Sequence, residues 1–103
     1  MPISKILELY TRSGQSLIEN GLNEAALPVR EAGVALNLFE QQRWRVLGGD
    51  VYHLTDAGRF ESTYENWSYE GHSADESVAV AREFIEGLAG RSAHIVFVVD
   101  DHD

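Results

Sequence analysis

The middle of the chain is built around a three-residue turn, Asp56-Ala57-Gly58, between two stretches suited to β-strands. Before the turn, large apolar side chains share one parity at Trp44, Val46, Tyr52 and Leu54. Gly58 supplies the left-handed backbone that a type I turn followed by a bulge requires, because glycine has no Cβ to clash there. A turn of this length joins neighbouring antiparallel strands. We therefore expect a β-hairpin with residues 59–69 as its return strand.

Pairing across this turn predicts which hairpin side chains face the core. Gly48-Gly49 interrupts the first strand and indicates a β-bulge. If Leu54 lies opposite Phe60, the core-facing pairs continue as Tyr52 with Ser62 and Asp50 with Tyr64, while His53 pairs with Glu61 outside. The outward face of the return strand then carries Glu61, Thr63, Glu65, Trp67 and Tyr69. Two large aromatic side chains on an exposed, acidic face are unusual.

Helical periodicity marks three other segments. They are a short helix ending by Ser13-Gly14, a helix over about residues 28–42 that begins at Pro28, and a helix from Ser73 that Gly90 ends. Ser73 followed three residues later by Glu76 matches a capping box, which predicts the start of the last helix. The continuous β-branched and aromatic run His94–Val99 suits a strand buried on both faces.

These elements predict a single α+β domain over residues 1–103 with the order ααββαβ. We expect a three-stranded sheet with an antiparallel hairpin, helices packed on one face, and Val96 and Val98 among the buried residues. The central strand stays open between two alternatives. Connection rules favour a last strand parallel to a neighbour reached through the helix, whereas its apolar run suits a middle position.

Charge is distributed unevenly along the chain. The net charge is −9, and residues 1–47 are neutral whereas residues 48–103 carry three basic and twelve acidic side chains. This balance argues against binding to nucleic acid or to anionic membranes and favours a basic partner. A solvated acidic surface and an anionic face for a cationic protein both fit the pattern. The chain has no cysteine, no apolar run of 18 residues and no signal-peptide plan at its N-terminus, so we expect a soluble, cytoplasmic protein.

No set of residues has the spacing of a catalytic or metal site. His53, His72, His94 and His102 lie at no ligand spacing, and Gly48-Gly49-Asp50 lacks the lysine and helix onset of a phosphate loop. A weak cation site at His102 with Asp100, Asp101 and Asp103 competes with a solvated acidic tail. We therefore expect no enzymatic activity, no metal and no cofactor.

The two arms of the hairpin hold the richest group of residues. One set fits a structural role, in which glycines permit the bulge and polar groups hydrogen-bond within the hairpin: Gly48, Gly49, Asp50, Tyr52, Tyr64 and Asn66. A second set fits a partner-binding face, with aromatic anchors among acids that select the partner's charge. This set is Glu61, Glu65, Trp67, Tyr69, Glu70, Asp75 and Glu76.

Several of these segments, in this order, resemble the immunity protein 40 family of bacterial polymorphic toxin systems. The segments are Gly21-Leu22, Ala25-Ala26-Leu27, Leu47-Gly48-Gly49-Asp50-Val51-Tyr52, Tyr64-Glu65-Asn66-Trp67, and Ser77 with Ala81-Arg82-Glu83-Phe84-Ile85. The resemblance covers residues 14 to 100. It implies a cytoplasmic antidote that binds and blocks a cognate toxin, as in contact-dependent inhibition.

Combined with the acidic second half, the resemblance suggests a basic toxin domain such as a nuclease. Other readings stay open: a small enzyme or ligand-binding domain that uses the hairpin as a cleft wall, or a regulatory subunit that homodimerises through the hairpin face. A monomer and a weak homodimer both fit the sequence.

Overall fold

The chain alternates helices and short strands around one sheet. The computed structural model describes residues 2–16 and 25–100. Its elements, in chain order, are α1 (Pro2–Ser13), β1 (Gln15–Ser16), β2 (Ala25–Pro28), α2 (Val29–Gln41), β3 (Arg45–Leu54), β4 (Phe60–Ser68), α3 (Ala74–Glu86) and β5 (Ala93–Asp100). The three helices and the hairpin were expected. The order ααββαβ is wrong because it lacks β1 and β2.

Four strands form the body of an antiparallel sheet, in the order β2-β5-β3-β4, and the two-residue β1 extends it at the β2 edge. The predicted three-stranded sheet is therefore too small. Strand β5 lies between β2 and β3 and is antiparallel to both, which places it inside the sheet. It is parallel to β4, to which α3 connects it, but β3 lies between the two.

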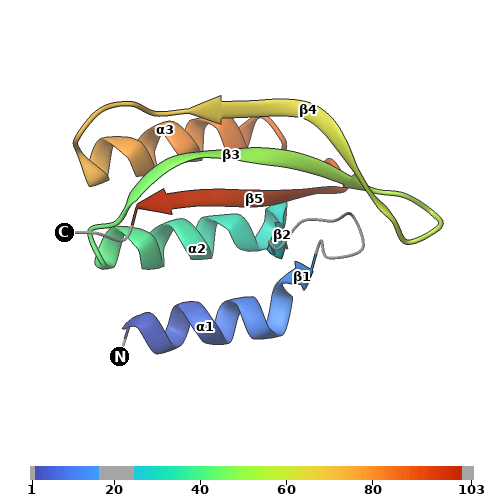
Figure 1. Cartoon of the computed structure of the whole chain (residues 1–103), viewed down its shortest axis with the longest axis horizontal. Helices are drawn as coiled ribbons and strands as arrows, with labels where there is room; N and C mark the ends of the chain where they lie inside the picture. Colours follow the sequence, from blue (N-terminus) through green and yellow to red (C-terminus); the bar gives the residue numbers. More distant parts are fainter. Residues whose placement is uncertain (1, 17–24, 101–103) are drawn as a thin grey trace.

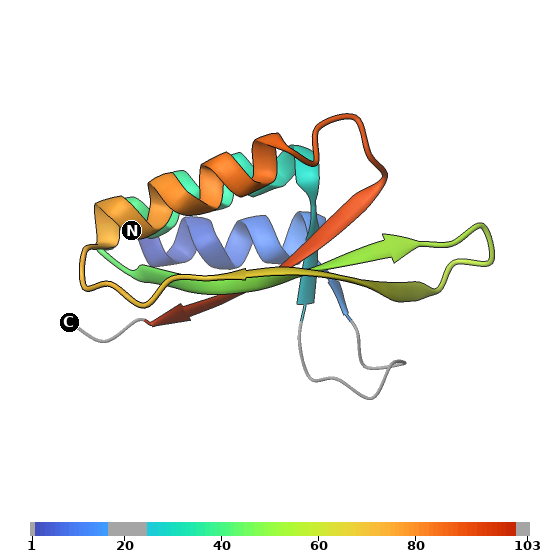
Figure 2. The same ribbon diagram turned by 90° about the horizontal axis from the view of Figure 1, so that it is seen from above.

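All three helices lie on one face of this sheet, as expected (Figures 1 and 2). Side chains from each helix meet the inner faces of the strands in two apolar clusters, and the partly buried Val29, Trp67 and Phe97 pack against both clusters. Their fully buried large members include Leu9, Leu27, Leu36, Val46, Val78 and Ile95. We call the sheet face opposite the helices the open face, because no helix in the described ranges covers it.

A β-bulge in β3 determines which side chains reach the core. Val46 pairs with Val99 and Gly48 pairs with Val98, so Leu47 is an extra residue with no partner in β5. The buried hydroxyl of Ser77 on α3 accepts a hydrogen bond from the Val46 amide at 2.9 Å. Because side chains alternate along a strand, one extra residue moves every later side chain to the opposite face.

The bulge therefore divides β3 into two halves of opposite parity. Before the bulge, the side chain of Val46 points to the helices. After the bulge, the side chain of Val51 points to the helices. Tyr52 turns to the open face and is buried there with Ala26, Val96 and the partly buried Phe60. The prediction that Val46 and Tyr52 share the core face is wrong for this reason.

The hairpin turn and the nearest strand pairs are as predicted. Gly58 has a φ of +81°, and the Thr55 amide bonds to the Arg59 carbonyl at 2.7 Å. The predicted pairs Leu54–Phe60, His53–Glu61 and Tyr52–Ser62 are confirmed.

Beyond these pairs β4 contains a second bulge. Asp50 lies opposite Asn66 rather than Tyr64, because residues 63–65 stand together opposite Val51. The predicted Asp50–Tyr64 pair is therefore wrong.

Strand β5 is only partly buried. Val96 is 3% exposed, as predicted, but Val98 is 44% exposed on the open face, so the prediction of a buried Val98 is wrong. The expectation of burial on both faces holds only where β2 and the Tyr52 cluster adjoin β5.

Candidate protein-binding surface

Trp67 is packed against the helix layer. Its ring stacks on Phe84 of α3 with centroids 4.6 Å apart and meets Phe97 of β5 edge-on at 6.0 Å. A Cβ on Gly49 would lie 2.5 Å from the indole, and one on Gly48 would collide with the Trp67 carbonyl oxygen. The two glycines therefore leave the space that Trp67 and its backbone occupy. The predicted outward orientation of Trp67 is wrong, because the prediction kept one parity across the bulge in β3.

Glu65 also turns to the helix side. Its two carboxylate oxygens accept hydrogen bonds from Arg91, at 2.9 and 2.5 Å. The Arg91 hydrogen bond lowers the pKa of Glu65, and the same bond raises the pKa of Arg91. The pair joins β4 to the segment before β5. Both side chains are more than 40% exposed, so water screens the pair and its contribution to stability is small.

Tyr69 belongs to the N-terminal cap of α3. Ser73 is the cap residue, as predicted, and its hydroxyl accepts the Glu76 amide at 3.1 Å. The Tyr69 hydroxyl accepts the Ser73 amide at 3.1 Å and donates to the Glu76 carboxylate at 2.9 Å. Partial burial raises the pKa of Tyr69, and the neighbouring Glu76 adds to that rise. In a capping box the Glu76 carboxylate would accept the Ser73 amide directly. Here the Tyr69 hydroxyl lies between these two groups and bonds to both.

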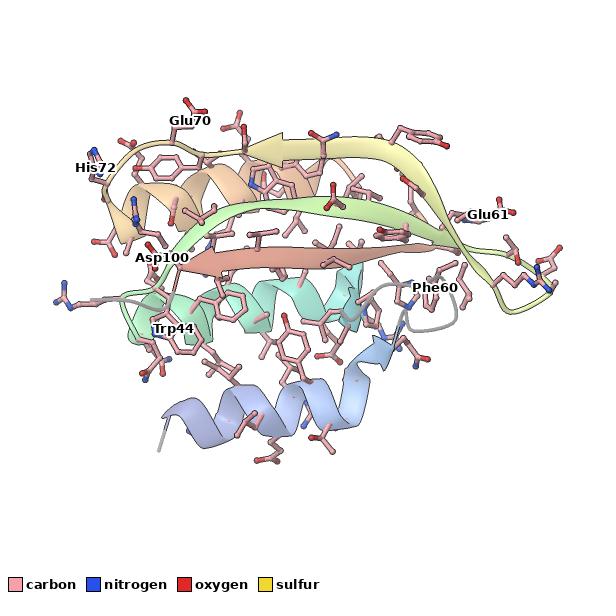
Figure 3. All side chains as sticks on the ribbon, in the orientation of Figure 1. Trp44, Phe60, Glu61, Glu70, His72 and Asp100 are labelled. Carbon is pink, nitrogen blue, oxygen red and sulfur yellow. The ribbon has the colours of Figure 1, made fainter. Side chains whose placement is uncertain are left out.

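The acidic members of the predicted binding set do not form one patch. Glu70, Asp75 and Glu76 are exposed around the β4–α3 loop and the first turn of α3, whereas Glu61 lies at the hairpin end of β4. Figure 3 shows Glu70 and Glu61 at opposite ends of the molecule. We call Glu70, Asp75 and Glu76 the loop acids.

The hairpin residues that were predicted to have a structural role do not all lie on the same face of the sheet. Asp50 and Asn66 are a directly opposed pair, and both are exposed on the open face. Tyr64 is 88% exposed, so its predicted inward packing is wrong. We call the exposed residues Asp50, Asn66, Ser68 and Val98, together with Tyr64 of the adjoining β4 bulge, the open-face patch.

The backbone of Tyr64 adopts a rare conformation, with a φ of +64°. Polar neighbours hold the bulge: Ser62 Oγ accepts the Tyr64 amide at 3.1 Å, and the Asn66 side-chain amide donates to the Tyr64 carbonyl at 3.2 Å. Thr63 Oγ1 accepts the Glu65 amide and donates to the Val51 carbonyl, both at 3.2 Å. A positive φ at a bulky residue costs on the order of 1–3 kcal/mol and persists only where the surroundings enforce it.

A cleft of about 960 Å³ lies on the helix side, between the start of α2, the α3–β5 connection and the hairpin end. Its lining has mixed charge and includes His94, Arg30, Arg91, Asp56 and Glu86. Burial lowers the pKa of His94, and the Arg30 charge lowers it further. The His94 Nδ1 is buried with no hydrogen-bond partner among the described residues.

Within residues 2–16 and 25–100, no group of three or more histidine, aspartate or glutamate side chains could hold a metal ion. The cation site considered at the C-terminus falls mostly on Asp101, His102 and Asp103, outside the described residues, as does the Gly21-Leu22 segment. Among the described residues, none of the helices combines the length and the apolar composition of a bilayer-spanning segment.

Comparison with known proteins gives one family. The model of the family described as Immunity protein 40 matches residues 16–99. This range contains both hairpin arms, the Trp67 packing and the cap of α3. No curated protein and no solved structure matches the chain.

Proposed function

The chain belongs to the immunity protein 40 family, and from this premise we propose that it binds a cognate bacterial toxin domain and blocks it. The family match over residues 16–99 is the observation that carries the proposal. The protein acts in the cytoplasm, as a monomer or weak homodimer, in a polymorphic toxin system of the contact-dependent type. It neutralises by occupying the toxin's surface. Such inhibition needs complementary shape and charge but no catalytic group or cofactor.

The toxin domain that fits this protein is basic, such as a nuclease. The support is the net charge of −9, all of which lies in residues 48–103. A nuclease must attract phosphate, so its active face is cationic and an acidic protein can compete for it.

The predicted binding residues have two roles in this proposal. Glu61 and the loop acids are exposed and guide a cationic partner towards the surface. Glu65, Trp67 and Tyr69 support the fold beneath the binding surface and do not contact the partner. Their side chains are engaged with Arg91, Phe84 and the α3 cap.

Co-expression tests the proposal. The toxic C-terminal domain encoded by the neighbouring gene is produced alone and together with this protein, and growth is followed. We expect growth arrest with the toxin alone and recovery with both. The purified protein should form a complex with that domain and show no turnover of nucleotides, esters or peptides. Continued arrest in cells that contain the folded protein would contradict the proposal.

A further inference from the structure

We propose that the toxin docks on the open-face patch, with Tyr64 as the apolar anchor and Asp50 as the group that pairs with an arginine or lysine of the toxin. This inference rests on the proposed function and adds the surface and its chemistry. Tyr64 takes the role of aromatic anchor that was predicted for Trp67. Exposure, backbone geometry and charge each support it independently.

The exposure of Tyr64 has no explanation in the packing of the fold. The side chain is 88% exposed, although tyrosine is a large residue that folding ordinarily buries at least in part. A tyrosine at a protein interface buries a rigid ring at low entropic cost and keeps a hydroxyl for hydrogen bonding. The side chain is therefore placed where a partner, and not this chain, can cover it.

The backbone at Tyr64 supports the same conclusion. Ser62, Thr63 and Asn66 all direct polar side chains to the backbone of the bulge. A glycine would fit the φ of +64° without strain. The chain instead keeps a bulky residue in a strained position and fixes it there. Strained residues held in this way are concentrated at functional sites.

Asp50 supplies the charge of the patch. It lies on the inner strand β3, between Asn66 of β4 and Val96 of β5. No hydrogen bond or ion pair to its carboxylate is found among the described residues. An arginine or lysine of the toxin can pair with this carboxylate, and the exposed ring of Tyr64 offers a face to which a second cationic side chain is attracted. Val98, 44% exposed on the neighbouring strand, adds apolar surface.

A structural alternative is that the bulge only protects the edge of the sheet. Strand β4 is an edge strand, and bulges prevent edge strands from pairing with other chains. This role needs the bulge but not the tyrosine. Replacing Tyr64 with glycine keeps the backbone conformation and removes the ring, so the two roles can be separated.

The test measures binding of a catalytically inactivated toxin domain by titration calorimetry, with melting temperatures recorded for every variant. For Tyr64→Gly we expect an unchanged or higher melting temperature and a dissociation constant raised on the order of tenfold or more. Asp50→Asn should weaken binding and reduce its salt dependence. The matched controls lie on the helices: Leu7→Ala removes another exposed apolar side chain, and Glu40→Gln another exposed carboxylate. Both should bind like the parent.

The outcomes separate the two proposals. If the parent does not bind the toxin domain, the proposed function is wrong and the docking surface is wrong with it. If the parent binds and both patch variants bind within twofold of it, the docking surface alone is overturned. Light scattering provides a further test: a parent dimer that Tyr64→Gly converts to a monomer would assign the patch to self-association and overturn this inference.

Discussion

Gly49 shows how one absent methyl group determines the position of a tryptophan. A Cβ at this position would lie 2.5 Å from the Trp67 indole and 2.9 Å from the Val96 carbonyl oxygen. The indole also stacks on Phe84 of α3, so a shift of the indole would disturb that contact. Gly49→Ala should therefore lower the free energy of unfolding by about 1–3 kcal/mol, the usual cost of overpacking a core. Urea denaturation measures this loss.

Gly33 is the matched control for this substitution. It lies within α2, and a Cβ there would meet nothing within 4 Å. Because alanine is the better helix former, Gly33→Ala should raise the free energy of unfolding by about 0.5–1 kcal/mol. Equal effects of the two substitutions would show that Gly49 does not provide space for Trp67.

His94 gives a residue-scale prediction about pH. Its pKa in the folded protein is below the ordinary value of 6.5, through burial and the nearby Arg30 charge. The unfolded chain therefore binds a proton at His94 at a higher pH than the folded protein does. The free energy of unfolding should fall as the pH is lowered through about 6.5 towards the folded-state value. Urea denaturation between pH 7.5 and 5.5 measures this slope.

The controls for the pH effect are two histidine variants. His94→Gln should reduce the slope, because the side chain that gains a proton on unfolding is gone. His53→Gln, at an exposed position of β3, should retain the slope of the parent. A slope that is the same in all three proteins would contradict the assignment to His94.

Tyr64 could not be placed correctly from the sequence. Positive φ is predictable where glycine marks it, as at Gly58, but Tyr64 adopts a φ of +64° without such a mark. The nearby polar residues Ser62, Thr63 and Asn66 hold the bulge. The same residue types are common on ordinary exposed strands, so their presence gave no distinct signal.

At the scale of elements, local signals were sufficient wherever the structure depends on neighbours in sequence. The turn at Gly58, the pairs next to it, the presence of the three helices and the Ser73 cap were predicted correctly, whereas the last helix ends at Glu86 and not at Gly90. Strand β2 was missed because Ala25–Pro28 is too short and too rich in alanine to show a strand pattern. Its position depends on pairing with β5, nearly seventy residues away.

The bulge in β3 had the largest consequence for the candidate site. Gly48-Gly49 predicted the bulge correctly, but the alternation was continued across it as if no residue had been added. A one-residue insertion exchanges the two faces. This exchange brings Trp67 to the core and leaves Asp50 and Asn66 exposed. Counting Leu47 as the extra residue reverses the predicted faces, but its identity follows from the pairing of β3 with β5, a contact between distant parts of the chain.

Ser77 stabilises this bulge, and its substitution gives a prediction at the element scale. The hydroxyl accepts the Val46 amide at 2.9 Å and donates to the Ala74 carbonyl at 2.7 Å. Ser77→Ala fills nearly the same volume but leaves the buried Val46 amide without a partner. The free energy of unfolding should fall by about 1–3 kcal/mol. Hydrogen exchange at the Val46 amide should become faster in the same variant.

Ser68→Ala is the control for the Ser77 substitution. Ser68 is exposed at the end of β4, so its replacement should change the free energy of unfolding by no more than about 0.5 kcal/mol. The bulge would not depend on Ser77 if the two variants were equally stable and the Val46 amide stayed protected in both.

At the scale of the whole molecule, the acidic side chains are concentrated on particular elements of the fold. From Arg45 to Glu86, the hairpin and α3 contain nine acidic and three basic side chains. Arg45 is engaged with Asp100, and beyond α3 Arg91 is engaged with Glu65. The loop acids lie at the start of α3, and α3 is separated from α1 by α2 (Figure 1). A cationic protein therefore meets an uneven field, strongest on the hairpin and α3 side.

The position of the loop acids should control how fast a basic toxin associates. In the triple variant Glu70→Gln, Asp75→Asn, Glu76→Gln, association should slow several-fold at low salt while dissociation changes little, because steering acts before contact forms.

The control variant Glu8→Gln, Glu31→Gln, Glu40→Gln removes the same charge from α1 and α2. Stopped-flow mixing at two salt concentrations measures both rates. Since salt screens steering, the two variants should converge at high salt. Equal slowing at low salt would mean that net charge, not its position, controls the encounter.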